Sequence, residues 1–528
     1  MKKLLIGYPK KKVAVELYEG FTKGFKIHYS GPRFHVFSKN LISANDFKVE
    51  IREKIFKEIK LGRIMGPFKY LPISNLRISP IGGVPKSDGS IRLITHLSHP
   101  QKTSVNDFIS NEFACVKYSS FDKVIDMIAD LGNGALIGKM DIKSAFRLLP
   151  LNPGDFDLFG FYFDDRYFVD KCLPMGCSES CSLFEKFSTF LHWKIADITG
   201  LKSLDHYLDD FIFAGRNNTD DCNTLMNKFQ TMCSELGVPI AHEKTIGPVQ
   251  VLTFLGLEIN TLQMQVKVPQ EKLDSLRDAL ESLLGRKKVT LREMQSLVGG
   301  LSFVCRAVRP GRVYLRRFYD AMSGIRAQHH HIRITEELSD DLRTWLRFLI
   351  SFNGTLYFPE SHWSSNHSLE LYTDSAGSCK LGCGAYFAGN WVYFAWPRHW
   401  HFKNIMRDIT CLELVPILLA ITLWGPALSN KKVLFRTDNK ALVQIINSQT
   451  SKSKRIMYLL RPLIMKCMEF NFSFRAKFIQ GTENQIADSI SRKQWGRFRG
   501  LAPKARRFPD RISKEFLQLI YDRKLAIC

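Results

Sequence analysis

Short apolar runs that end in acidic residues stand out in the first half of the chain. One run covers residues 135–140 and is followed by Asp141; another covers residues 204–215 and contains the adjacent carboxylates Asp209 and Asp210. Apolar, β-prone residues on both sides of an acidic pair predict a tight hairpin whose strands lie buried in a sheet. The pattern therefore predicts strands that present acids at their ends.

A helical pattern replaces these strands from Pro269 onward. Leucines recur at intervals of three and four residues, which predicts a helix with one apolar face. A second helix is predicted to begin after Thr290, with Glu293 placed to complete a capping box. Five arginines follow between residues 306 and 317, and a solvated basic face is the default interpretation of them.

The last third of the chain returns to apolar runs that end in acids. Strands are predicted over 369–374, 384–387, 391–395 and 433–438, and two of them end at Asp374 and Asp438. A helix has Glu413 near its start, and a later helix contains Asp488. Any one of these acids could be a helix cap or a surface residue, so only their number and order indicate a shared site.

Charge and length narrow the class of protein. Lys and Arg number 75 against 51 for Asp and Glu, a net charge of +24, which favours a polyanionic partner and salt-sensitive binding. A chain of 528 residues predicts three or more folding units. The longest apolar run, 414–428, is too short to span a bilayer and directly follows Glu413, so we expect no membrane partner.

The cysteines indicate a reducing compartment. All twelve lack a Cys-x-x-Cys pair, and the spacing of Cys172, Cys177, Cys181 and His192 fits no usual zinc pattern. The basic start of the chain has too short an apolar core for a secretory signal. We therefore expect a cytoplasmic location, inside particles or free, or a nuclear one.

The acidic hairpin predicts a metal site. Burying acids beside apolar strands is costly unless cations share the charge. Mg²⁺ takes hard oxygen ligands and binds through one or two carboxylates plus substrate phosphates. A solvated turn is the ordinary interpretation of a single Asp-Asp pair. The presence of a third acid, Asp141, favours a metal site instead.

Five segments in order resemble the palm of reverse transcriptases: the strand ending at Asp141, residues 173–176, Tyr-Leu-Asp-Asp at 207–210, and residues 237–245 and 254–259. The later acids resemble the Asp-Glu-Asp-Asp set of ribonucleases H. The resemblance implies an α+β multidomain fold, a right-hand polymerase with fingers, palm and thumb followed by an α/β RNase H-like domain with a mixed sheet. It divides the chain into a basic lead (1–60), fingers and palm (61–262), a helical thumb and connector (263–365), RNase H (366–495) and a basic tail (496–528).

The resemblance also implies roles for individual residues. Two Mg²⁺ ions per site, with Mn²⁺ as the alternative, would be held for two-metal phosphoryl transfer. The catalytic metal ligands would be Asp141, Asp209 and Asp210 in the palm, and Asp374, Glu413, Asp438 and Asp488 in the RNase H domain. Nucleotide binding would fall to Lys86, Arg92, Phe146, Met175 and Lys244, and the primer grip to Phe254, Leu255 and Gly256. Met175 departs from the Gln or Phe of better-known members, and Lys244 could equally be a solvated loop lysine.

The implied function is an RNA-directed and DNA-directed DNA polymerase with ribonuclease H activity. Its partners would be an RNA template, a DNA primer, their hybrid and dNTPs. Residues 92–100, 144–151 and 297–303 look most like the DIRS/Ngaro class of retrotransposons, with gypsy-like elements and pararetroviruses as alternatives. A Gag-like protein and a recombinase would then be further partners. A catalytically silent, domesticated nucleic-acid-binding protein stays open as the alternative, although all seven acids are present.

Overall fold

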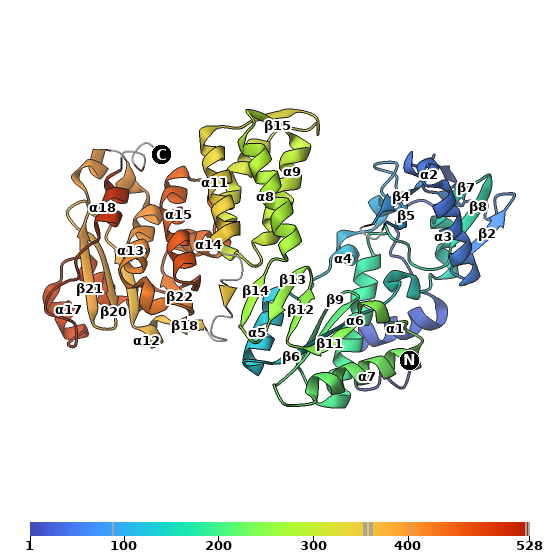
Figure 1. Cartoon of the computed structure of the whole chain (residues 1–528), viewed down its shortest axis with the longest axis horizontal. Helices are drawn as coiled ribbons and strands as arrows, with labels where there is room; N and C mark the ends of the chain where they lie inside the picture. The colour runs from blue at the N-terminus through green and yellow to red at the C-terminus, as the bar shows by residue number, and fades with distance from the viewer. Residues whose placement is uncertain (87–88, 352–355, 358–362, 403, 523–524, 526–528) are drawn as a thin grey trace. The chain divides into compact units, whose positions relative to one another are not determined.

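The structure is a computed structural model that describes all residues except 87–88, 352–355, 358–362, 403, 523–524 and 526–528 (Figure 1). The chain forms two compact units, Met1–Leu252 and Thr253–Cys528, and the finer division into three or more folding units stays a prediction. The helical and RNase H-like segments share the second unit because α15 (Lys454–Glu469) packs against η5 (Arg309–Leu315). The division at residue 252 also precedes the palm boundary predicted at residue 262.

Residues 1–60, the predicted basic lead, are part of the first unit. α1 (Lys11–Lys23) packs against α6 (Ser180–Thr199), and α3 (Lys48–Lys60) buries Ile51 and Ile55 against a five-stranded sheet. Apolar residues between the lysines thus anchor both helices. The order of that sheet is β1-β3-β7-β8-β2, formed by β1 (Val36–Phe37), β2 (Ile64–Phe68), β3 (Arg77–Ile78), β7 (Gly160–Phe163) and β8 (Arg166–Asp170).

A four-stranded sheet carries the acidic hairpin, with the order β11-β6-β10-β9. α6 and α7 (Asp221–Leu236) pack against it, as Figure 1 shows. Phe211 on the sheet is buried against Phe229 of α7, with ring centroids 4.4 Å apart. The strands are β6 (Leu136–Asp141), β9 (Leu204–Tyr207), β10 (Asp210–Gly215) and β11 (Ile246–Val249).

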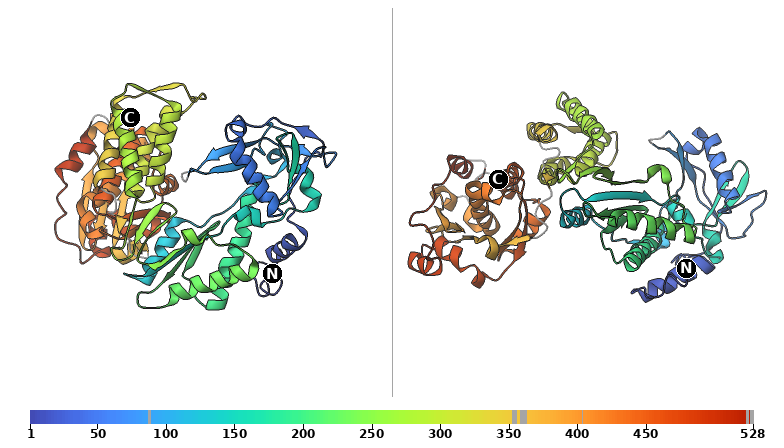
Figure 2. Two further views of the ribbon diagram at one scale, coloured as in Figure 1. Left: turned by 45° about the vertical axis from the view of Figure 1, so that its right-hand side comes forward. Right: turned by 60° about the horizontal axis from the view of Figure 1, so that its bottom comes forward.

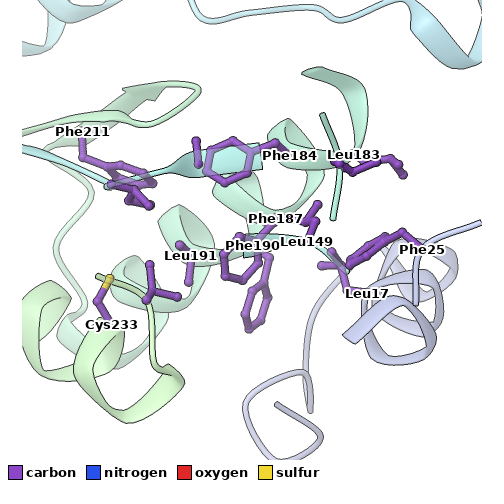
Figure 3. Packing of buried hydrophobic residues seen from close by; sticks show 14 of the residues in the cluster. Leu17, Phe25, Leu149, Leu183, Phe184, Phe187, Phe190, Leu191, Phe211 and Cys233 are labelled. Carbon is purple, nitrogen blue, oxygen red and sulfur yellow. The ribbon is translucent and has the colours of Figure 1, made fainter. Parts of the chain in front are cut away.

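Aromatic side chains of α6 fill the core behind this sheet. Phe184, Phe187 and Leu191 follow one another at helical intervals of three and four and are buried. Figure 3 shows the α6 rings between Phe25 on one side and Cys233 on the other. Each fully buried aromatic ring of this kind contributes about 1.5–3 kcal/mol, so α6 is a rigid support for the strands beside it.

The second unit begins with a small sheet, and helices follow it, as the leucine spacing predicted. The predicted capping box is confirmed: Thr290 Oγ1 accepts from the Glu293 N–H at 3.3 Å, and Glu293 Oε2 accepts from the Thr290 N–H at 2.7 Å. The helices are α8 (Gln270–Leu284), α9 (Leu291–Val304), α10 (Arg316–Met322) and α11 (Glu336–Ser351). The small sheet, β12-β13-β14-β17, comprises β12 (Val251–Phe254), β13 (Leu257–Asn260), β14 (Gln265–Lys267) and β17 (Leu356–Tyr357).

The C-terminal part is an α/β fold with antiparallel and parallel strands. β19 contacts β22, so the antiparallel group β19-β20-β21 lies beside the parallel group β18-β22-β23. The antiparallel strands are β19 (Leu371–Ser375), β20 (Gly382–Phe387) and β21 (Asn390–Ala395), and the parallel ones are β18 (Trp363–Ser365), β22 (Lys432–Thr437) and β23 (Ser473–Phe478). The helices around them are α13 (Ile409–Trp424), α14 (Lys440–Ser448), α15 and α16 (Gln485–Ser491).

α13 is the apolar helix that the sequence placed near residues 414–428. With the turn that follows it, the helical run Ile409–Leu428 is 20 residues long with a mean hydropathy of 1.9, enough by length and composition to cross a membrane. However, 78% of its apolar window is buried inside the protein. It packs against β19, β20 and α15, which is the environment of a core helix.

The predicted basic tail is folded in its described part. α17 (Trp495–Leu501) and α18 (Lys514–Tyr521) bury Phe498 and Phe516. The two rings lie 5.1 Å from Trp391 and 5.5 Å from Phe394 of β21, respectively. The red C-terminal helices accordingly stay with the orange strands in both views of Figure 2. Aromatic residues among the arginines therefore attach this segment to the sheet.

Candidate active sites

The Tyr207–Asp210 segment forms the tight hairpin that the sequence predicted. Tyr207 pairs with Asp210 at the ends of β9 and β10, which leaves Leu208 and Asp209 as the two turn residues. Leu208 has a φ of +54°, a conformation that a side chain with a Cβ rarely adopts. Such strain usually persists where a turn has a functional task, here the presentation of a carboxylate.

The third acid lies beside this hairpin. β6 runs antiparallel to β10, and its last residue, Asp141, is the direct partner of Asp210. The Ile142 N–H donates to the Asp209 carbonyl oxygen at 3.0 Å, which ties the two strand ends together. The structure thus gathers Asp141, Asp209 and Asp210 at one end of the sheet, as predicted.

Burial and mutual repulsion make two of these carboxylates, Asp209 and Asp210, hard to ionise. Burial, followed by the negative charges of Asp209 and Asp141, raises the pKa of Asp210 to about 6. Burial also raises the pKa of Asp209, and the cations Lys244 and Arg92 partly oppose that change. A cluster that is short of positive charge and has only oxygen ligands fits a hard divalent cation such as Mg²⁺ or Mn²⁺.

Two of the predicted nucleotide-binding cations act on this cluster. Lys244, in the turn His242–Lys244, places its Nζ 2.8 Å from Asp141 Oδ2, and this contact raises the pKa of Lys244. Arg92 is exposed on β5 (Ile91–Thr95), which pairs with β4 (Ile81–Pro85) as an antiparallel hairpin. The Lys86 N–H closes that hairpin on the Ser90 carbonyl oxygen at 2.8 Å. Residues 87–88, between the two strands, lie outside the described residues.

The other predicted nucleotide-binding residues line the same unit. Phe146 is half-buried on a short 3₁₀ helix, with its ring 5.8 Å from that of Phe184. Met175 is 37% exposed, and its carbonyl oxygen accepts from the Thr95 N–H at 3.4 Å. Gly176 has a φ of +117°, and a Cβ there would overlap the Thr95 carbonyl oxygen, so only glycine fits.

Asn106 holds this segment in place, and the sequence analysis missed it. Its side-chain Nδ2 donates to the Gly176 carbonyl oxygen at 2.8 Å, and its Oδ1 accepts from the Ser178 N–H at 2.9 Å. These partners are 70 and 72 residues away in sequence. No local pattern could have revealed them.

The predicted primer grip is the turn between β12 and β13, in the second unit. Phe254 is buried, and Leu255 and Gly256 have φ values of +47° and +80°. A Cβ on Gly256 would lie 2.8 Å from Lys272 Nζ and 3.0 Å from the Phe303 ring. The turn is therefore tightly packed, and its contact with a primer stays a prediction.

The second acidic cluster draws on four elements of the C-terminal fold. Asp374 lies on β19, Glu413 on α13, Asp438 directly after β22, and Asp488 on α16. Burial raises the pKa of Glu413 to about 8, and the charges of Asp374 and Asp438 add to this change. Burial likewise raises the pKa of Asp374 to about 7, with Asp488 and Asp438 contributing. The structure therefore brings all four predicted acids into one electrostatic cluster.

Two hydroxyl groups orient the buried members of this cluster. Ser375 Oγ donates to Glu413 Oε1 at 2.8 Å, and Ser491 Oγ donates to Asp374 Oδ2 at 2.6 Å. The sequence analysis missed both serines. Ser375 directly follows Asp374 in sequence, whereas Ser491 is 117 residues from its partner and depends on the fold.

Two arginines contact a third carboxylate of this cluster, that of Asp488. Asp488 accepts from Arg492 Nε at 2.5 Å and from Arg497 Nη1 at 2.8 Å. The spacing of four residues along a helix could have revealed Arg492 from sequence. Arg497 contacts Asp488 only because α17 turns back beside α16.

Comparison with known proteins agrees with this geometry. Residues 84–259 match the family described as reverse transcriptase (RNA-dependent DNA polymerase). Protein P of duck hepatitis B virus (strain China) is 28% identical over 282 residues, which are 53% of this chain and 33% of that protein. The Gag-Pro-Pol polyprotein of Mason-Pfizer monkey virus is 26% identical over 209 residues, 38% of this chain and 11% of the polyprotein.

The chain thus matches at most about a third of the length of these relatives. The foamy viral protease-reverse transcriptase bound to an RNA/DNA hybrid covers 90% of this chain and 62% of its own, with a TM-score of 0.51 at 16% identity. A second foamy viral structure, bound to double-stranded DNA, matches 90% of this chain and 81% of its own chain. Its TM-score is 0.50 at 17% identity. The fold is therefore that of a reverse transcriptase, and residues 84–259 are similar to the reverse transcriptase family.

Proposed function

We propose that this protein is an RNA-directed and DNA-directed DNA polymerase that also cleaves the RNA strand of RNA–DNA hybrids. The observation that carries the proposal is the presence of two separate carboxylate clusters. Each contains acids whose pKa is raised by burial and by its neighbours. The family match over residues 84–259 supports the polymerase assignment for the first cluster.

At the polymerase site, Asp141, Asp209 and Asp210 hold two Mg²⁺ ions, with Mn²⁺ as a substitute. Bound in pairs, such ions activate an attacking oxygen and stabilise the charge on a leaving group. Lys244, beside Asp141, is placed to neutralise charge on a departing pyrophosphate, and Arg92 to contact the triphosphate. Phe146 and Met175 then shape the nucleotide site, and residues 254–256 position the primer.

At the RNase H site, Asp374, Glu413, Asp438 and Asp488 would hold the ions, which would activate a water molecule for attack on the phosphodiester. Ser375 and Ser491 keep two of these carboxylates oriented. When ions bind, at least one of the ion pairs that Arg492 and Arg497 make with Asp488 must break.

The proposed partners are an RNA template, a DNA primer, their hybrid and dNTPs, in keeping with the net charge of +24. We assign the chain to the DIRS/Ngaro class of retrotransposons on the segments 92–100, 144–151 and 297–303. That assignment adds a Gag-like protein and a recombinase as partners, with no membrane partner. It also places the protein in the cytoplasm, inside particles or free, or in the nucleus.

Primer extension on poly(rA)/oligo(dT) with Mg²⁺, with RNA cleavage of a labelled hybrid measured in parallel, tests both activities. Asp209→Asn should abolish extension and leave cleavage intact, and Asp438→Asn should do the reverse. Asp197→Asn, an exposed acid paired with Lys194 at 2.9 Å, is the matched control and should change neither.

Wild-type protein that binds the hybrid but neither extends nor cleaves it would refute the proposal. That result would favour the catalytically silent nucleic-acid-binding protein. Loss of both activities in either variant would instead refute the assignment of two independent sites.

A further inference from the structure

A pair of histidines faces each other beside the polymerase hairpin. His192 on α6 and His206 on β9 bring their Nδ1 atoms to within 3.0 Å. The carboxylate of Asp205 is close by, with Oδ1 4.0 Å from His192 Nδ1. One ligand atom from each of these residues lies within 4.8 Å of the other two. Two nitrogens and one oxygen thus lie close enough to one another to hold one metal ion.

The neighbours of these side chains orient them as metal ligands are usually oriented. His206 Nε2 donates to Glu185 Oε1 at 3.2 Å, which leaves the lone pair of Nδ1 directed at His192. A ligating histidine characteristically donates its other nitrogen to a carboxylate in this way. Asp205 Oδ2 accepts from Ser119 Oγ at 2.5 Å, which fixes the carboxylate.

The scaffold of the three residues is rigid. His206 is 7% exposed, pairs through β9 with Phe211, and stacks its ring on that of Phe211 at 5.2 Å. Burial lowers the pKa of His192 to about 4, so its ring is neutral at pH 7, as a ligand requires. Tetrahedral bonds of about 2.0–2.2 Å separate neighbouring ligand atoms by about 3.3–3.6 Å. Small side-chain rotations would bring all three groups to that spacing.

A simple hydrogen bond is the competing interpretation of the histidine pair. His192 Nδ1–H can donate to the free Nδ1 of His206, and this shared proton satisfies both rings without an ion. The same arrangement is what a metal-free site would adopt, because an ion takes the place of that proton. In that interpretation Asp205 is a structural acceptor, which takes hydrogen bonds from Ser119 Oγ and, through Oδ1, from the His206 N–H at 2.8 Å.

We propose that His192, His206 and Asp205 bind one divalent transition metal of the zinc type, with water as the fourth ligand. Two imidazole nitrogens favour Zn²⁺ or Co²⁺, whereas the carboxylate clusters favour Mg²⁺ or Mn²⁺. The site is therefore chemically distinct from both active sites and does not depend on the proposed polymerase function. It cross-links α6 to β9, whose last residue, Tyr207, leads directly into the catalytic turn.

Metal titration of the full chain tests the proposal. Protein stripped with a chelator and dialysed is titrated with Co²⁺ at pH 7.5, in the presence of excess Mg²⁺ to occupy the carboxylate clusters. His192→Gln and His206→Gln should each remove one equivalent of bound Co²⁺ and the intense visible absorption of a tetrahedral complex. His330→Gln is the matched control, because the exposed run 329–331 is the rival binder, and it should keep that absorption.

Thermal unfolding separates loss of the site from loss of the fold. Zn²⁺ should raise the unfolding midpoint of wild type and of His330→Gln, but not that of either site variant. Circular dichroism of the metal-free variants should match wild type. Should a variant unfold, Asp205→Asn provides the second test, with an expected loss of Co²⁺ affinity of about 10-fold or more.

Equal Co²⁺ stoichiometry and absorption in wild type, His192→Gln and Asp205→Asn would overturn the proposal. So would an absorption that disappears only in His330→Gln. In both cases the histidine pair is a hydrogen-bonded part of the palm core.

Discussion

Glu413 should destabilise the metal-free protein, and replacing it with glutamine should stabilise that state. The side chain is 8% exposed and its pKa is raised from 4.5 to about 8, mainly by burial. The folded state therefore keeps a proton that the unfolded chain loses above pH 4.5. Stability of the metal-free wild type must fall as pH rises from about 4.5 to 8.

The size of the effect follows from the shift in pKa. Each unit corresponds to about 1.4 kcal/mol, so full deprotonation costs at most about 5 kcal/mol. Part of this energy is shared with Asp374, whose pKa is raised by the same cluster, so we expect about 2–5 kcal/mol from Glu413→Gln. Glutamine can still accept the hydrogen bond from Ser375 Oγ, which preserves the local geometry.

Thermal unfolding of chelated protein between pH 5 and pH 8.5 measures this effect. Glu413→Gln should unfold about 5–15 °C above wild type at pH 8, and the difference should vanish near pH 5. Glu483→Gln, an exposed acid of the same fold, should match wild type throughout. When Mg²⁺ is added, the difference in unfolding temperature between Glu413→Gln and wild type should shrink or change sign. The reason is that only wild type gains the full binding energy of the ions. A variant that is no more stable than wild type at pH 8, or whose advantage grows toward pH 5, would refute the reasoning.

Three further substitutions separate the two sites. Ser491→Ala removes the hydroxyl that orients Asp374, so hybrid cleavage should fall about 10–100-fold while primer extension measured in the same tubes is unchanged. Gly176→Ala would overlap a backbone carbonyl oxygen of β5 and should cost about 2–4 kcal/mol, seen as an earlier denaturation of the first unit and loss of extension, with cleavage retained. Lys244→Ala frees Asp141 of a cation and should lower the Mg²⁺ concentration for half-maximal extension about 3–10-fold, whatever happens to kcat; an unchanged Mg²⁺ titration would contradict the ion pair.

The acids of both sites were predictable from sequence because each ends a strand or lies on a helix with a regular apolar pattern. Asp141, for example, closes a strand whose pairing with β10 then fixes it beside Asp210. The capping box at Thr290 was predictable for the same reason, since its partner is three residues away. Short-range spacing in the sequence is thus enough to predict the helices and strands and the residues at their ends.

Long-range partners were not predictable in this way. Asp341 is 1% exposed and accepts from both Arg317 and Arg461, the second of them 120 residues later, and this ion pair ties the helical segment to the RNase H-like fold. That contact is one reason why the helical segment and the RNase H-like fold belong to one compact unit. Burial of Phe498 similarly depends on a sheet formed more than 100 residues earlier.

The acidic cluster of the RNase H-like fold holds its carboxylates with two kinds of partner. The most buried members, Glu413 and Asp374, receive hydroxyl groups, which satisfy an oxygen without adding charge. The more accessible Asp488 instead receives arginines that are 50% and 42% exposed. Exposed ion pairs contribute at most about 1 kcal/mol each, so the arginines can be displaced at little cost. Ions that enter the cluster would therefore find Glu413 and Asp374 already oriented by hydroxyl groups. The arginines on the accessible Asp488 can be displaced by those ions at little cost.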